Sequence, residues 1–429
     1  MISKSVISIL LILFIIAILT CAMAPQYSSK LPADQWVEQT LKKMSLREKI
    51  AQMLVMNFTA RYYPEDSDEW QRIEEYIKKY KVGGFHVWRG DVYAMAMMVN
   101  KMQRISKIPI LFDADFERGV GLQFPGAVEF PPNMAFGAAR SERYAYKMGK
   151  ITAIEARALG FHQTYAPVVD INNNPENPII NVRSFGEDPV LVSKLASAFI
   201  KGAQENGIMA TAKHFPGHGD TGIDSHRELP VIDVERARLD SIELSSFRTA
   251  IDAGVKTIMS AHIYVSALED WPGKPATLSY NVLTGLLREE MGYDGLIVTD
   301  AMWMGGIVNN YTVKYSTLEA VKAGADLIIF KENPEIAIET LENAVKEGEI
   351  SEARINESVK RILKAKADLG LHKNRFIAPD KIEKIVGKKS LRDFADEVAR
   401  RAITLVKNEK NLVPLTLLTD TTKVYILNV

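Results

Sequence analysis

The sequence contains one cysteine, Cys21, among its 429 residues. A single cysteine excludes an internal disulfide, a cysteine-rich zinc ribbon and an iron–sulfur cluster. Lysine plus arginine total 53 and aspartate plus glutamate total 53, so the chain lacks the basic excess typical of nucleic-acid binding. It also lacks an acidic tail and low-complexity tracts, which would indicate disorder. At about 150 residues per domain, the length fits two or three domains, or one large barrel with an extension.

The N-terminus carries the one strongly apolar run, residues 5–20, which follows Lys4. The run is short for a membrane span, which needs about 20 apolar residues, and a short basic start before it is typical of a secretory signal. We predict that residues 1–24 are a signal peptide cleaved at a small-residue site, or a lipoprotein signal in which Cys21 is lipidated. An uncleaved anchor is the third alternative. All three place the body outside the cytoplasm, and two of them allow membrane anchoring through the N-terminus.

The body alternates short apolar runs with longer amphipathic stretches. Eight runs read as buried strands: 53–58, 82–87, 108–112, 161–169, 208–212, 255–260, 296–298 and 326–330. Helical patterns lie between most of them, for example at 143–159, 189–206, 234–253 and 277–291. Nearly continuous apolar strands separated by helices indicate a parallel sheet that is covered on both faces. We therefore predict an α/β fold, a (β/α)₈ TIM-type barrel over residues 31–370, with a doubly wound open sheet as the alternative.

The composition changes after Gly370. Residues 371–389 are polar and rich in lysine, which suits a linker. Residues 390–405 read as a helix, and 412–415 and 423–429 read as strands. We predict that residues 390–429 are the beginning of a second, truncated α/β domain, because a lone strand has no partner for its backbone groups. The alternative is a C-terminal extension that docks on the barrel.

Polar side chains follow most of the predicted strands. In (β/α)₈ barrels the active site lies at the carboxyl ends of the strands. The residues at or just after these ends are Arg89, Asp91, Asp113, Asp115, Glu117, Asp170, Lys213, His214, His262, Asp300 and Lys331. Any one of them could simply end a strand, but together they predict a site at one mouth of the barrel.

The segment 212–226 holds three of the seven histidines. Its glycines and proline disfavour a helix, so His214 and His218 share no helix face. A metal site would need Asp220 or Asp224 as a third ligand, and we regard it as the weaker interpretation. In the stronger interpretation Asp224 orients His226, which then donates and accepts a proton near neutral pH. The alternative is a hydrogen-bonded pair that only holds the loop together.

The run 295–300 delivers a single carboxylate, Asp300, to the predicted barrel mouth. A carboxylate in this position can act as a nucleophile toward the electrophilic carbon of a sugar. The alternatives are a helix cap or an ion pair with lysine or arginine.

Four segments resemble motifs of glycoside hydrolase family 3, and more narrowly of its β-N-acetylglucosaminidase branch. They are residues 213–221 (KHFPGHGDT) with 224–226 (DSH), 183–189 (RSFGEDP), Thr299 with Asp300, and 166–172 (APVVDIN). The likeness runs from about residue 36 to the end. One segment departs from it: Arg118 stands where the family often has a glycine, and Gln123 stands near the place of a sugar-contacting arginine, so the resemblance does not supply that contact.

The resemblance implies specific roles. Asp300 would be the nucleophile, and His226, oriented by Asp224, the general acid and base. The residues that would bind the hydroxyls of the terminal N-acetylglucosamine are Asp115, Arg183, Lys213 and His214. No cofactor and no metal are implied.

The predicted function is retaining exo-β-N-acetylglucosaminidase activity through a covalent glycosyl-enzyme, on a small oligosaccharide such as a peptidoglycan or chitin fragment. A deprotonated histidine carries no negative charge, so phosphate could compete with water as acceptor. The alternatives are a β-glucosidase of the same family, a non-catalytic surface glycan-binding barrel, and a metal-dependent hydrolase.

Overall fold

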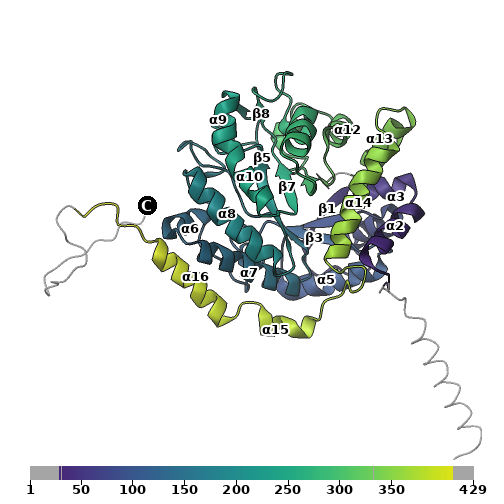
Figure 1. Ribbon diagram of the computed structural model, residues 1–429. Helices are drawn as coiled ribbons and strands as arrows, with labels where there is room; N and C mark the ends of the chain where they lie inside the picture. Colours follow the sequence, from purple (N-terminus) through teal and green to yellow (C-terminus); the bar gives the residue numbers. More distant parts are fainter. Residues whose placement is uncertain (1–28, 30, 332, 409–429) are drawn as a thin grey trace, which may run out of the picture.

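The computed structural model describes residue 29, residues 31–331 and residues 333–408 (Figure 1). Its centre is an eight-stranded sheet in which every recorded strand pair is parallel. The strands are β1 (Leu54–Ala60), β2 (Gly84–Gly90), β3 (Leu111–Ala114), β4 (Gln163–Thr164), β5 (Met209–Phe215), β7 (Thr257–Ser260), β9 (Leu296–Val298) and β10 (Ile328–Phe330). A bridge between Val298 and Leu327 joins β9 to β10 and closes the sheet. The predicted (β/α)₈ barrel is therefore confirmed, and the open sheet is excluded.

The strands coincide with the apolar runs of the sequence, because both of their faces are covered. Every residue of β3, β5 and β7 is buried. The fourth strand is shorter than the predicted 161–169. Regular pairing stops after Thr164, and the chain returns to β5 only at Val168, which bridges to Lys213. Pro167 lies in the gap and has no N–H to offer the ladder.

Helices surround the barrel (Figure 1). The α-helices up to the eighth connection are α2 (Ala33–Lys43), α3 (Leu46–Gln52), α4 (Asp68–Glu75), α5 (Val92–Ile105), α6 (Asn133–Ala139), α7 (Glu142–Ala158), α8 (Pro189–Gln204), α9 (Arg236–Ser241), α10 (Glu243–Asp252), α11 (Gly305–Val308), α12 (Val313–Ala323), α13 (Pro334–Lys346) and α14 (Glu352–Asp368). Two π-helical segments, η1 (Tyr76–Tyr80) and η5 (Asn281–Glu290), and the short 3-10 turns η2 (Val120–Leu122), η3 (Asn181–Arg183) and η4 (Ala276–Leu278) complete the connections. A separate two-stranded parallel ribbon pairs β6 (Val231–Ile232) with β8 (Tyr264–Val265).

Two predicted helices differ in detail from the structure. The helix predicted over 234–253 is split into α9 and α10, because Ile242 leaves helical geometry with φ −112° and ψ −78°. The helix predicted over 277–291 is the turn η4 followed by the π-helix η5. Neither difference moves a strand, so the mouth of the barrel is unaffected.

The chain after the barrel lies against it. The segment 371–389, predicted as a linker, contains η6 (Pro379–Lys381) and α15 (Ile382–Ile385), and the following α16 (Lys389–Ala402) runs outside α6 (Figure 1). Phe394 of α16 is buried, with its ring 6.0 Å from that of Phe130 and 5.5 Å from that of Tyr144. The predicted strands 412–415 and 423–429, and the predicted signal 1–24 with Cys21, lie outside the described residues. In the part of the chain that the structure describes, no helix has the length and apolarity to cross a bilayer.

Candidate active site

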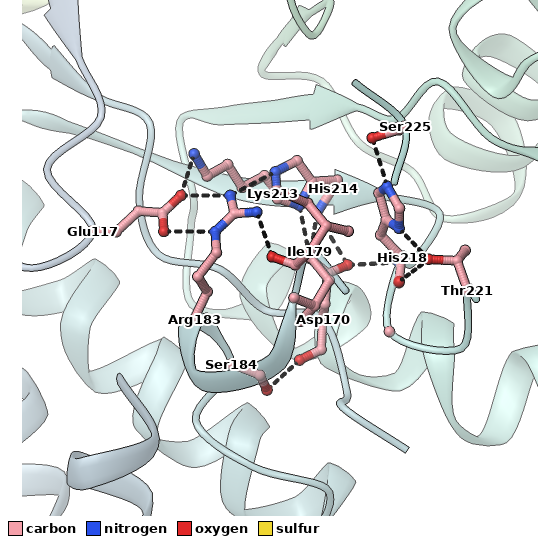
Figure 2. A network of polar contacts seen from close by, with 12 residues as sticks. Glu117, Asp170, Ile179, Arg183, Ser184, Lys213, His214, His218, Thr221 and Ser225 are labelled. Carbon is pink, nitrogen blue, oxygen red and sulfur yellow. Dashed lines mark hydrogen bonds and ion pairs between the residues drawn. The ribbon is translucent and has the colours of Figure 1, made fainter. Parts of the chain in front are cut away.

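Charged side chains from β5 and from the segments after β3 and β4 meet at the carboxyl ends of the strands (Figure 2). Lys213, at the end of β5, is buried, and its Nζ lies 2.6 Å from Asp115 Oδ1 and 2.7 Å from Glu117 Oε1. Burial favours the neutral form of Lys213, but the two carboxylates outweigh it and the pKa of Lys213 is raised. Lys213 is therefore a cation at neutral pH, held between two anions.

Arg183 completes this cluster from η3, beyond β4. Its Nε and Nη2 donate to the two oxygens of Glu117 at 2.9 and 2.7 Å, which is the bidentate geometry of a strong ion pair. Burial alone would raise the pKa of Glu117, but Arg183 and Lys213 hold that pKa well below its usual value. Arg183 Nη2 also lies 3.3 Å from His214 Nε2. The resemblance described above implied that Asp115, Arg183, Lys213 and His214 share one site, and the structure brings all four together.

Asp170 anchors the other side of the cluster. Its carboxylate accepts hydrogen bonds from His214 Nδ1 at 2.7 Å and from the His218 amide at 2.7 Å, and it is 1% exposed. Burial would raise the pKa of Asp170, yet the His214 side chain and these donors lower it. The carboxylate therefore stays ionised and fixes the orientation of the His214 ring.

The loop after β5 is held by His218. Its Nδ1 lies 2.7 Å from Thr221 Oγ1 and its Nε2 lies 2.8 Å from Ser225 Oγ (Figure 2). Burial, with a further contribution from His214, lowers the pKa of His218 to about 4, so the ring is neutral at pH 7. Gly219 permits this packing, because a Cβ there would lie 1.7 Å from the carbonyl oxygen of Ile171. His218 thus fixes the loop on both sides of Asp224.

Asp224 and His226 form a pair on the exposed edge of this loop. Asp224 Oδ1 accepts hydrogen bonds from His226 Nδ1 at 2.8 Å and from the His226 amide at 2.9 Å. Burial opposes ionisation of Asp224, but these two donors lower its pKa. The carboxylate thereby keeps the Nδ1 proton in place and leaves Nε2 as the nitrogen that can exchange a proton. The side chain of His226 is 54% exposed, so this nitrogen can reach solvent or a ligand.

Asp300 follows β9 and is half-buried at the barrel mouth. Burial alone would raise the pKa of Asp300, but attraction from the His262 and His214 side chains outweighs it and lowers that pKa. Beside it, His262 Nε2 lies 3.1 Å from the Ala301 carbonyl oxygen, which can only accept, so this nitrogen carries a proton. Burial keeps the pKa of His262 below its usual value despite the charge of Asp300. Asp300 is therefore an ionised carboxylate at neutral pH.

The loop of His226 is joined to the segment that follows Asp300. The amides of Gly305 and Gly306 donate to the carbonyl oxygens of His226 and Ser225 at 3.0 and 3.1 Å. This close approach requires a glycine, since a Cβ on Gly305 would lie 2.2 Å from the Arg227 carbonyl oxygen. The two candidate catalytic residues thus come from segments that are directly hydrogen-bonded to each other at the same end of the barrel.

His86 and Tyr165 belong to the site but were not singled out from the sequence. His86 on β2 is buried, with its Nδ1 2.7 Å from Asp113 Oδ1 and its Nε2 3.6 Å from Asp115 Oδ2. Its ring stacks on Tyr165, with 5.4 Å between centroids. Strand alternation could have found His86, because it stands two residues before Trp88 on the same face of a strand whose end faces the mouth.

Arg118, the departure from the family pattern, points its guanidinium to Glu129 rather than into the cluster around Lys213. No group of three His, Cys, Asp or Glu side chains suited to a metal ion occurs among the described residues. His214 and His218, the ligands of the weaker metal interpretation, have both ring nitrogens next to protein groups.

Comparison with known proteins places this site in a family. Residues 45–365 match the family described as "Glycosyl hydrolase family 3 N terminal domain". The chain belongs to glycosyl hydrolase family 3. The resemblance seen in the sequence motifs is therefore confirmed.

Three known proteins illustrate the similarity. "Beta-hexosaminidase A" of Pseudoalteromonas piscicida is 33% identical over 375 residues, which are 80% of this chain and 62% of that protein. A solved family 3 β-N-acetylglucosaminidase from Paenibacillus sp. str. FPU-7 superposes with a TM-score of 0.77 at 37% identity, covering 85% of this chain and 70% of its own. A solved "Beta-glucoside phosphorylase BglX bound to 2FGlc" gives a TM-score of 0.83 at 30% identity. The match covers 92% of this chain and 71% of that chain. The chain thus spans well under the full length of each.

Proposed function

We propose that the protein is a retaining exo-β-N-acetylglucosaminidase that releases terminal N-acetylglucosamine from small oligosaccharides. The observation that carries the proposal is the Asp224–His226 pair on a loop hydrogen-bonded to the segment after Asp300. An ionised carboxylate and an exposed, oriented imidazole at one barrel mouth are the two groups that a double displacement needs. The name of the Paenibacillus relative supports N-acetylglucosamine as the sugar, and the name of the Pseudoalteromonas relative, a β-hexosaminidase, supports a hexosamine.

The chemistry follows from the protonation states of the two groups. Asp300 attacks the anomeric carbon while His226 Nε2–H protonates the glycosidic oxygen, so that the carbon–oxygen bond breaks and a glycosyl ester forms. In the second step the neutral His226 Nε2 takes a proton from water. The water oxygen attacks the same carbon and Asp300 leaves. Two displacements at one carbon retain its configuration.

The charged cluster would hold the terminal sugar. Asp115, Lys213 and Arg183 present fixed donors and acceptors that are already paired with one another or with Glu117. Hydroxyl groups of the sugar can join these pairs without reorganising them, and charge-assisted hydrogen bonds in a site with little water are strong.

The test is a paired assay with 4-nitrophenyl N-acetyl-β-glucosaminide and 4-nitrophenyl β-glucoside, followed by proton NMR of the first anomer released. The proposal predicts preference for the N-acetylated sugar and initial release of the β-anomer. Preference for the glucoside would favour the β-glucosidase alternative. Initial release of the α-anomer would exclude a covalent intermediate.

Phosphate is a second candidate acceptor. We infer this from His226, because an imidazole that has lost its proton does not repel an anion as a carboxylate would. The solved relative named as a phosphorylase supports the idea. Product analysis in phosphate buffer decides it: N-acetylglucosamine 1-phosphate should accumulate alongside the free sugar, and its absence at every phosphate concentration would reject this candidate.

A further inference from the structure

His86 is a buried imidazole at the barrel mouth that the proposed mechanism does not use. It lies on β2, and its Nδ1 is 2.7 Å from Asp113 Oδ1. Its Nε2 is 3.6 Å from Asp115 Oδ2, an ion-pair contact that is longer than a hydrogen bond. The other oxygen of Asp115, Oδ1, is 2.6 Å from Lys213 Nζ. Asp115 therefore faces Lys213 with one oxygen and His86 with the other.

The two carboxylates decide where the protons of the His86 ring lie. A carboxylate oxygen only accepts, so the 2.7 Å contact with Asp113 needs a proton between the two atoms. A lone pair on Nε2 would face the Asp115 carboxylate and be repelled by it. The favoured state therefore has a proton on Nε2 as well, whether the other proton is on Nδ1 or on Asp113.

The ion pairs around Asp115 leave a place for this extra proton. Besides His86, they form one connected group of three carboxylates and two cations: Asp113, Asp115, Glu117, Lys213 and Arg183. The carboxylates exceed the cations by one, and a buried charge without a counter-charge is costly. A protonated His86 brings the group to balance.

The groups that face His86 from the neighbouring strands keep the proton in place. Burial opposes the charge and Lys213 on β5 repels it, but attraction by Asp113 and Asp115 prevails and raises the pKa of His86. Tyr165, after β4, stacks on the ring with 5.4 Å between centroids. Burial and Asp113 hold the pKa of Tyr165 well above its usual value, so Tyr165 stays neutral.

We propose that His86 is a positioning residue for the terminal sugar: its Nε2 proton holds Asp115 from the side opposite Lys213, so that the carboxylate binds sugar hydroxyls in a fixed orientation. This inference rests on the proposed function, in which Asp115 binds the sugar, and deepens it by making sugar binding depend on pH. When His86 and Asp113 lose their extra proton at alkaline pH, Nε2 turns a lone pair toward Asp115. Binding of the sugar then weakens.

Two substitutions separate the two contacts of His86. The amide of glutamine can place a donor near the position of Nε2, whereas the shorter asparagine can place one only near the position of Nδ1. We expect His86→Asn to raise KM for 4-nitrophenyl N-acetyl-β-glucosaminide by about tenfold, the scale of a lost interaction with a charged group, with kcat nearly unchanged. His86→Gln should recover most of this loss. Equal rises of KM in both variants would contradict the proposal.

A double-mutant cycle shows whether His86 acts through Asp115. In an Asp115→Asn background, His86→Asn should raise KM no further, because the carboxylate that His86 positions is gone. A role for His86 in packing alone predicts that the two losses add. Additive losses would therefore overturn the inference.

The pH dependence of sugar binding tests the wild type directly. Calorimetric titration with N-acetylglucosamine measures Kd without any bond cleavage. Kd should rise by about tenfold in the wild type between about pH 6 and about pH 9, because the raised pKa of His86 lies above the usual value of about 6.5. Kd should rise less steeply in His86→Gln, because an amide does not titrate. Titration of His226 is common to both proteins, so equal slopes would reject the role of His86.

Failure of this inference can be told apart from failure of the proposed function. If the wild type does not cleave 4-nitrophenyl N-acetyl-β-glucosaminide, the proposed function is wrong. If it cleaves this substrate but His86→Asn keeps the wild-type KM, only the role of His86 is wrong. Should His86→Asn not fold, as a thermal melt would show, the pH slopes of the wild type and His86→Gln still decide.

Discussion

The two halves of the candidate site are built differently. Around Lys213 and Arg183, buried and half-buried charges are paired with Glu117 and Asp115, and the adjoining His214 is paired with Asp170, in a closed network. On the loop after β5, His226 has one partner, Asp224, and more than half of its side chain is exposed. Groups that bind a sugar benefit from being fixed before it arrives, whereas a group that exchanges protons needs access to water and to the leaving oxygen. The difference fits the proposed roles, in which the buried cluster would bind the sugar and His226 would transfer the proton.

Asp300→Asn should have the largest effect, because in the proposed mechanism both halves serve the carbon that Asp300 would attack. We expect kcat/KM to fall by about 10⁴-fold, as when a catalytic group is removed from other hydrolases. The measurement is hydrolysis of 4-nitrophenyl N-acetyl-β-glucosaminide. Asp294→Asn is the matched control at the opposite end of β9, where the carboxylate is 92% exposed, and it should keep wild-type activity. Similar losses in both variants would contradict the assignment.

His226→Ala tests the exposed half. Loss of a general acid costs about 10²–10⁴-fold, and the cost depends on how much the leaving group needs a proton. We therefore expect a large loss with alkyl or sugar leaving groups and a much smaller loss of bond cleavage with 4-nitrophenolate. A series of aryl N-acetyl-β-glucosaminides of increasing leaving-group pKa measures this. Equal losses across the series would remove His226 from the acid role.

Glu117→Gln tests the closed network. It leaves Arg183 and Lys213 short of a buried counter-charge, which typically costs about 3–5 kcal/mol in the free energy of unfolding. Glu129→Gln is the matched control, because Glu129 is exposed in its pair with Arg118 and surface pairs contribute about 0–1 kcal/mol. Urea unfolding at pH 7 compares the two, and similar small changes in both would contradict a closed network.

The free energy of unfolding of Glu117→Gln should also differ from that of the wild type in its dependence on pH. The folded-state pKa of Glu117 is lowered by Arg183 and Lys213, although burial opposes this, so the unfolded state takes up protons first as the pH falls. The stability that Glu117 contributes is complete above the unfolded pKa of about 4.3 and is lost as the pH falls toward the folded value. Unfolding free energies at pH 7, 5 and 3.5 should therefore decline less steeply in Glu117→Gln than in the wild type.

Asp224→Asn should have the smallest effect. The pair is partly exposed, so the free energy of unfolding should change by less than about 1 kcal/mol. Activity should fall by roughly tenfold, by analogy with carboxylates that orient metal-bound histidines. An assay and a thermal melt on one preparation measure both. A large loss of stability with unchanged activity would make Asp224 a loop staple instead of an orienting residue.

The sequence predicts the frame of this site well. The eight apolar runs mark the barrel strands, because a strand covered on both faces has to be apolar throughout. The Asp224–His226 pair is predictable because its partners are two residues apart, and the structure places them 2.8 Å apart. Features that depend on residues close together in the chain can therefore be predicted from the sequence.

Contacts between distant residues are not predictable in this way. Arg183 meets Glu117 across 66 positions, and Lys213 meets Asp115 across 98. Their pairing depends on where the strand ends stand around the barrel, which no local pattern encodes. For His86 only the partner was unpredictable, since Asp113 lies on the neighbouring strand, whereas the alternation along β2 could have indicated His86 itself.

The proposed covalent role of Asp300 is tested most directly by trapping the glycosyl-enzyme. A 5-fluoro N-acetylglucosaminyl fluoride should inactivate the enzyme with time, and peptide mapping should find the sugar ester on Asp300. A label on any other residue, or inactivation without a label, would contradict the account.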